Sequence, residues 1–312
     1  MKKSKFLNGI KIVWLVAVIA GGVYYVVKNY DTAIEYFSSI EPLELIISFV
    51  LIIALRILSI DLVQRSLVII GWKPNFKRAF SLVSISQLGK YIPGGIWQFV
   101  ARFGAYKENQ ISTKDMGKSF LIENIWMVGG AFFCSLAFLL ISMPDTVLQD
   151  VNLQLSTLIR YLLSLVCIIL WLLMLIIIER IFDQKPKRDH PKIVLKQFIS
   201  QAVMWIINGI SFFILLPGTE IVNGTFFSIG GFGASFLAGY VAIFAPGGLG
   251  VREYVTTVLF SLVYVNVEIG ILSIVHRLLY TIAEFLLAGI AYLIPNNGQP
   301  VADSEPALTD LH

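Results

Sequence analysis

Blocks of about 20 apolar residues follow one another along most of the 312-residue chain. A helix needs about 20 apolar residues to cross the hydrocarbon core of a bilayer. Hydrophobic residues make up 57% of the chain and charged residues only 14%, which is unlike an average soluble domain. We therefore predict an all-α, polytopic membrane protein whose loops hold no soluble catalytic domain.

Six of these blocks predict uninterrupted spans, at about residues 10–28, 43–64, 119–141, 158–180, 197–216 and 271–294. Two others, at about 79–103 and 226–264, each contain the helix-breaking sequence Pro-Gly-Gly. Together the blocks predict a single transmembrane domain over residues 1–294. The tail at 295–312 is acidic and contains no Lys or Arg, which predicts a short, disordered cytoplasmic end.

Lys and Arg residues are distributed unevenly between the two ends of the predicted spans. Eighteen of them lie in four short ranges: 2–11, 65–78, 102–118 and 180–196. All four ranges reach the same side if each interrupted segment leaves on the face that it entered, and only Lys28 and Arg160 then lie on the other side. Because positive loops stay in the cytoplasm, the first side and both termini are predicted to be cytoplasmic.

The two halves of the chain, about 1–141 and 156–294, have the same order of spans but start on opposite sides. Each half reads span, span, interrupted segment, span. Such halves are candidate inverted repeats, although their sequences have little in common beyond Pro-Gly-Gly. Paired interruptions in the halves of a membrane protein are the best sequence pointer to a transport site.

The two Pro-Gly-Gly motifs, at 93–95 and 246–248, occupy corresponding places in these halves. Proline removes a backbone donor and glycine permits unusual conformations, so each motif should start a new half-helix, near 96–98 and near 249–251. A helix start suits an anion, whereas the alternative is an ordinary turn. The first segment predicts two half-helices of about 10 residues, about 15 Å each. The second is either similar or two nearly complete spans that meet at Pro246.

Four cations lie at membrane depth, where a charge is costly and marks a functional site by default: Arg56, Lys90, Arg252 and Arg277. Near the broken-helix starts they suit a phosphate headgroup, because Arg offers a bidentate fork and Lys a point charge. The alternative is internal charge pairing, with four predicted pairs: Lys90 with Glu123, Arg277 with Glu284, Arg252 with Glu253, and Asp61 with Arg65.

Other polar and metal-binding residues give less specific signals. Glu123 is either a proton-coupling carboxylate or an interfacial residue, and His276 is predicted to be a core histidine. Cys134 and Cys167 have no Cys or His at ligand spacing, so no metal or cofactor site is predicted. Trp97 opens a half-helix and is a further candidate for the site.

The first motif and its flanks, 88–98, and the second, 246–253, together with Arg102 and Glu123, resemble one family over nearly the whole chain. This is the lysylphosphatidylglycerol synthase transmembrane-region family of flippase-like proteins. The resemblance implies a multi-pass protein of the bacterial or archaeal cytoplasmic membrane that moves lipids or lipid-linked sugars between leaflets. The chain ends soon after the last span, without the soluble aminoacyl-transfer domain of the two-domain synthases, so synthesis of lysyl-lipid is not expected.

The resemblance and the residue patterns give one set of candidate substrate-binding residues, none of them assigned as catalytic: Arg56, Lys90, Tyr91, Pro93, Gly94, Gly95, Trp97, Arg102, Glu123, Pro246, Gly247, Gly248, Arg252, Glu253 and Arg277. The leading hypothesis is a flippase that is not an enzyme and that binds an anionic headgroup near the midplane. Its lipid partner would be a phospholipid or a polyprenyl-phosphate-linked sugar.

Two rival hypotheses remain open. The first is a membrane-embedded transferase that uses Glu123, Glu253 or Glu284 as a base on a lipid-linked substrate. The second is a non-catalytic scaffold of a polysaccharide assembly complex. Stand-alone members of the family suggest partners in cell-envelope biosynthesis, and no nucleic-acid partner is expected. The oligomeric state is left open.

The Lys/Arg asymmetry predicts that positions 148 and 220 face outward, whereas 75, 110 and 187 face the cytoplasm. Single cysteines at these positions, in a Cys134→Ser, Cys167→Ser background, can be exposed to an impermeant thiol reagent on intact cells. Positions 148 and 220 should be labelled at once, and the other three only after lysis. Strong labelling at 110 or 187 in intact cells would contradict the inverted topology.

Overall fold

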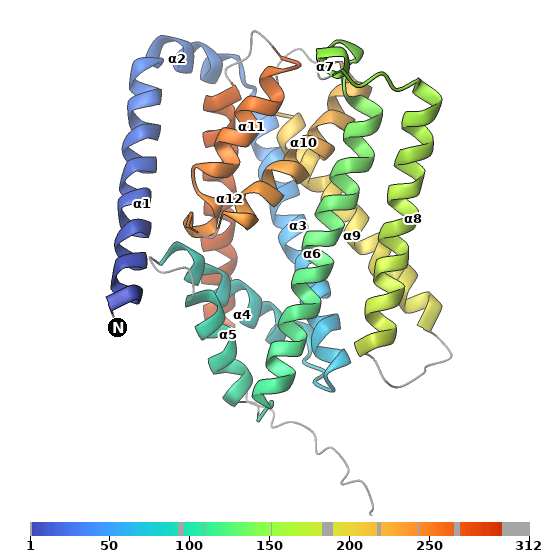
Figure 1. Ribbon diagram of the computed structural model, residues 1–312. Helices are drawn as coiled ribbons and strands as arrows, with labels where there is room; N and C mark the ends of the chain where they lie inside the picture. The colour runs from blue at the N-terminus through green and yellow to red at the C-terminus, as the bar shows by residue number, and fades with distance from the viewer. Residues whose placement is uncertain are drawn as a thin grey trace, which may run out of the picture.

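Helices are the only regular elements in the residues that the computed structural model describes (Figure 1), which are 2–92, 97–108, 110–150, 152–182, 190–216, 220–242, 244–264 and 269–294. The α-helices are Lys2–Lys28 (α1), Tyr30–Ser39 (α2), Pro42–Ile69 (α3), Phe76–Gln87 (α4), Trp97–Glu108 (α5), Thr113–Ser142 (α6), Asp145–Asp150 (α7), Thr157–Phe182 (α8), His190–Phe213 (α9), Ile221–Val241 (α10), Val251–Ser261 (α11) and Ile269–Leu293 (α12). Two 3₁₀ turns are Leu88–Tyr91 (η1) and Pro246–Gly248 (η2). The predicted all-α fold is confirmed.

Six of these helices are long and apolar enough to cross a membrane, namely α3, α6, α8, α9, α10 and α12. Five of the six coincide with spans predicted as uninterrupted, and the first predicted span, 10–28, lies within α1. The interrupted segment 226–264 has one arm of 21 residues, α10, and one of 11 residues, α11. This arrangement lies between the two forms expected, which were two short half-helices and two nearly complete spans. The tail at 295–312 lies outside the described residues.

The long helices pack closely enough to form a firm bundle. Ser135 Oγ of α6 donates a hydrogen bond of 2.6 Å to the carbonyl of Gly230 on α10. A Cβ atom on Gly230 would lie 2.8 Å from the backbone nitrogen of Leu139, so the approach of these two helices needs glycine. Trp126 of α6 and Trp171 of α8 belong to the apolar core that these helices share with α9 and α10. This bundle is the frame against which the interrupted segments rest.

Two bends interrupt the helical path near the mid-height of the molecule (Figure 1). The turn η1 follows α4 and precedes α5 in the chain, and η2 lies between α10 and α11. The two turns contact each other. In Figure 1, α4 and α5 lie below the bends, and α10 and α11 lie above them. The half-helices α5 and α11 begin at Trp97 and Val251, as the sequence predicts, and α4 and α5 have 12 residues each.

The second bend depends on three glycines in the left-handed region of backbone conformation. Gly247, Gly248 and Gly250 have φ values of 60°, 71° and 83°. Residues with a Cβ atom rarely adopt such backbone angles. The carbonyl of Leu249, in the same bend, accepts a 3.0 Å hydrogen bond from Trp14 Nε1 of α1. The bend is therefore a defined structure with a partner helix beside it.

Replacing Gly247 and Gly248 by alanine should lower the stability of the folded protein by about 2–4 kcal/mol, since each left-handed residue costs about 1–2 kcal/mol with a Cβ. At Gly248 the added Cβ would also lie 3.0 Å from the Cα of Gly239. The control is Gly21→Ala with Gly22→Ala in α1, where a Cβ meets no atom within 4 Å. Thermal unfolding in detergent is the measurement. Equal losses in the two double variants would mean that the bend does not need glycine.

Candidate functional site

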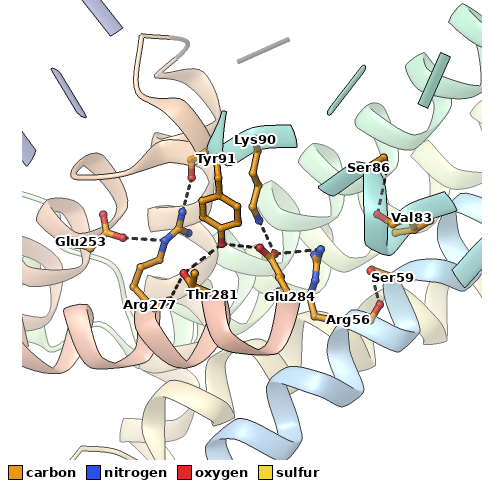
Figure 2. A network of polar contacts seen from close by, with 11 residues as sticks. Arg56, Ser59, Val83, Ser86, Lys90, Tyr91, Glu253, Arg277, Thr281 and Glu284 are labelled. Atoms are coloured by element: carbon orange, nitrogen blue, oxygen red, sulfur yellow. Dashed lines mark hydrogen bonds and ion pairs between the residues drawn. The ribbon is translucent and has the colours of Figure 1, made fainter. Parts of the chain in front are cut away.

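Glu284 of α12 is the centre of a buried polar cluster at the bends (Figure 2), with a side chain only 1% exposed. Its carboxylate accepts a hydrogen bond of 2.5 Å from Lys90 Nζ of η1 and one of 2.7 Å from the Tyr91 hydroxyl. Arg56 Nη2 of α3 lies 3.1 Å from the same carboxylate. A single side chain thus connects a bend to two long helices.

The cluster lies halfway along the helices that carry it. Arg56 is at the midpoint of α3, and Glu284 is within one turn of the midpoint of α12. Both helices are long and apolar enough to cross a bilayer. Charges this far from either helix end are costly in hydrocarbon, so they need partners or a function.

Arg277 of α12 holds the second bend. Its Nη2 donates a 3.0 Å hydrogen bond to the carbonyl of Gly247, and its Nε lies 3.5 Å from Glu253 Oε1, an ion pair without a hydrogen bond. The other oxygen of Glu253 accepts the backbone N–H of Gly250 at 2.7 Å and so caps α11. The guanidinium therefore fixes both the bend and the residue that caps the helix after it.

One face of α12 joins the two bends. Arg277, Thr281 and Glu284 are four and three residues apart and lie along the same face. Thr281 Oγ1 donates to the Arg277 carbonyl at 2.9 Å, and the Tyr91 hydroxyl lies 3.2 Å from Thr281 Oγ1. Figure 2 follows this line of contacts from Glu253 to Arg56. Residues of both interrupted segments thus form one polar cluster.

Arg252 differs from the other cations of the cluster because no carboxylate is paired with it among the described residues. Its guanidinium lies over the ring of Phe236, 4.6 Å from the centroid, and its buried Nε has no hydrogen-bond partner. Gly239 and Gly248 make room for it, since Cβ atoms there would lie 2.4 Å from its Cγ and 2.9 Å from its Nε. The backbone thus accommodates an arginine that forms no ion pair within the described residues.

A cavity of about 30 Å³ lies beside Arg252, with room for roughly one or two water molecules. Its lining includes Arg277, His276 and the buried Asn208, whose Oδ1 has no hydrogen-bond partner. His276 is 1% exposed, and its Nε2 lies 2.9 Å from Ser211 Oγ. The prediction of a core histidine is confirmed, and the lining of the cavity, although mostly apolar, includes polar atoms without a hydrogen-bond partner.

Arg102 and Glu123 form a separate buried network. Glu123 is paired with Arg102 Nη1 and also accepts hydrogen bonds from Ser66 Oγ (2.7 Å) and Ser119 Oγ (3.2 Å). These contacts tie α5 to α6 and α3, and none of these partners is shared with Glu284. The sequence assigned both residues to the substrate site, and the structure places them apart from the Glu284 cluster, where their contacts also hold the first interrupted segment against the bundle.

Three of the charge pairs expected from the sequence are not found in the described residues, and two of them are replaced by other pairs. Lys90 binds Glu284 and not Glu123, and Arg277 pairs with Glu253 and not with Glu284. Arg252 forms no ion pair with its neighbour Glu253 in the described part of the chain. The expected pairs followed sequence proximity, whereas the observed ones are set by how η1 and α11 pack against α12.

Ionic contacts at the helix ends lie away from the cluster. Arg65 forms a bidentate pair with Glu179, at 2.9 and 2.5 Å, and Lys196 Nζ lies 3.3 Å from Asp61 on the surface. The sequence predicted only a pair between Asp61 and Arg65. It did not predict the contacts of these two residues with α8 and α9. These contacts fasten the ends of the bundle.

The other sequence candidates have mixed outcomes. Pro93, Gly94 and Gly95 lie outside the described residues. Trp97 begins α5 with 44% of its surface exposed, and Pro246 lies buried in η2. The central role of Glu284 was missed, since the sequence suggested it only as a partner of Arg277 or as a base. A carboxylate in the middle of an apolar span is a signal that could have found it.

Comparison with known proteins identifies the family of the chain. Curated proteins include no significant match to it. The family model described as "Lysylphosphatidylglycerol synthase TM region" matches residues 12–288, which is nearly the whole sequence. This match confirms the resemblance expected from the two Pro-Gly-Gly motifs. The chain therefore belongs to the lysylphosphatidylglycerol synthase transmembrane-region family of membrane proteins.

Proposed function

We propose that this chain is a flippase that moves a lipid with an anionic phosphate headgroup between the leaflets of a bacterial or archaeal cytoplasmic membrane. The observation that carries the proposal is the cluster where the two bends meet. It brings together Arg56 and Arg277, which lie inside long apolar helices, with Lys90 of η1 and Arg252 at the start of α11. Four cations at that depth suit an anion that has to leave water.

The two interrupted segments would act as re-entrant hairpins that enter from opposite faces. Half-helices of 12 residues, as in α4 and α5, are about 18 Å long, close to half of a hydrocarbon core of about 30 Å. The 11 residues of α11 give a similar length. These lengths support an inverted repeat whose two bends meet near the midplane, as in transporters with discontinuous helices.

The geometry suggests how a headgroup would be held and released. In the absence of lipid, Glu284 pairs with both Lys90 and Arg56, which keeps these two buried cations in place. A phosphate would bind the same donors and the guanidinium of Arg252, which has no carboxylate partner among the described residues. Since Lys90 belongs to one bend and Arg252 follows the other, a movement between the two hairpins would expose the site to one leaflet and then to the other.

Transport by proteoliposomes tests the proposal. With fluorescent phospholipid or a polyprenyl-phosphate-linked sugar in one leaflet, Arg252→Gln and Lys90→Gln should each slow exchange about ten- to a hundredfold. A lost charge-assisted hydrogen bond is worth about 1.5–3 kcal/mol. Arg252→Lys should also be slow, because an ammonium cannot replace a bidentate fork. The matched control is Lys77→Gln on the exposed start of α4, which should leave the rate unchanged.

Two outcomes would contradict the flippase. If Arg252→Gln leaves exchange intact, the phosphate site is wrong. If the wild-type protein accelerates no anionic lipid, a scaffold becomes the better hypothesis, and release of a modified lipid in the same vesicles would instead indicate a transferase. In each case the folded state of the variant is checked by its elution in detergent.

A further inference from the structure

We infer that the site is matched to a headgroup with two negative charges, a phosphate monoester or a diphosphate diester, and not to the single charge of an ordinary phosphodiester lipid. The inference rests on the proposed function and narrows its substrate class. It comes from the balance of charges in the cluster around η1, η2 and α12, together with the place of each charge.

The cluster has two more cations than carboxylates. The cations are Arg56, Lys90, Arg252 and Arg277, and the carboxylates are Glu253 and Glu284. The undescribed residues next to the bends, 93–96 and 243, are Pro, Gly, Gly, Ile and Ile, none of them ionisable.

The aromatic and histidine side chains at the cluster do not change this balance. The Tyr91 hydroxyl donates to Glu284 as a neutral group. His276 is counted as neutral because its Nε2 contacts the hydroxyl of Ser211 and its ring packs against Phe212 and Phe232. Arg102 does not enter the balance, because it is already neutralised by Glu123 in the separate network. Without a headgroup, the cluster therefore carries two more positive than negative charges.

An uncompensated surplus of this kind is costly at the middle of a bilayer. A buried charge is tolerated when it is paired and becomes strongly unfavourable when its partner is missing. A headgroup with one negative charge would leave one cation unpaired, whereas a headgroup with two would make the loaded site neutral. The preference should therefore follow the charge of the headgroup more than its size or its hydrogen-bonding groups.

The surplus is divided evenly between the two bends. Beside η1, Glu284 is shared by Lys90 and Arg56, which leaves one positive charge. Beside η2, Glu253 pairs with Arg277 and leaves Arg252 without a carboxylate. The Tyr91–Thr281 contact joins the two sides along α12. Two phosphates in tandem, or one phosphate with two charges between the bends, would satisfy both sides at once.

Binding of lipids with identical acyl chains to the purified full chain separates these cases. The probes are phosphatidic acid (monoester, about two charges at pH 8), cytidine-diphosphate diacylglycerol (diphosphate diester), phosphatidylglycerol (one charge) and phosphatidylcholine (none net). Affinity is read by native mass spectrometry. One or both of the doubly charged lipids should bind at least about tenfold more tightly than phosphatidylglycerol. Which of the two binds better distinguishes a single phosphate from tandem phosphates.

A charge-shifted variant makes the test specific to the cluster. Arg252→Gln lowers the surplus to one, so its preference for doubly charged lipids over phosphatidylglycerol should largely disappear. Lys77→Gln removes a charge of the same sign from the exposed surface and should keep the full preference.

Equal affinity of the wild-type protein for singly and doubly charged lipids would overturn the inference. The proposed flippase would survive that result if the proteoliposomes still exchange anionic lipid. Absence of both binding and exchange would overturn the proposed function together with the inference. An undiminished preference in Arg252→Gln would show that the surplus around the bends does not select the headgroup.

Discussion

The contacts of the Glu284 carboxylate hold the centre of this protein together. One side chain on α12 receives Lys90 from η1 and Arg56 from α3, so it joins an interrupted segment to two spanning helices. Removing one partner of a buried ion pair costs about 3–5 kcal/mol, whereas a protein in which apolar residues replace the whole pair is often as stable. Stability alone therefore does not explain why charged groups lie at this depth. Anion binding, as proposed above, would explain these charges, with the carboxylate pairing the same cations while no headgroup is bound.

The polar interior has two kinds of buried cation, and their difference carries the functional argument. Arg102 is paired with Glu123, whose carboxylate also accepts hydrogen bonds from two serine hydroxyls, which suits an anchor between α5 and the bundle. Arg252 has a place made by two glycines and an aromatic ring, but no carboxylate. A backbone shaped around a guanidinium without an ion-pair partner among the described residues, beside a small cavity, is better suited to a substrate than to packing.

The sequence predicted what depends on local residues. Apolar block length located the helices that cross a membrane, and the chemistry of proline and glycine located the starts of α5 and α11. Pairing could not be predicted, because Lys90 and Glu284 are 194 positions apart and Arg65 and Glu179 are 114 apart. Such pairs depend on which helix faces come together. The resemblance placed Arg102 and Glu123 among the candidate site residues, and only packing revealed that their network is separate from the one around Glu284.

The depth of the bends in the bilayer tests the central claim most directly. Ile92, at the end of η1, and Phe244, just before η2, are 48% and 47% exposed and can each carry a nitroxide in a protein without other cysteines. Relaxation by oxygen and by a water-soluble nickel chelate in liposomes reports the depth of each label. We expect both labels within about 5 Å of the bilayer centre. Labels about 15 Å from the centre, at the edge of the hydrocarbon core, would contradict bends that meet at the midplane.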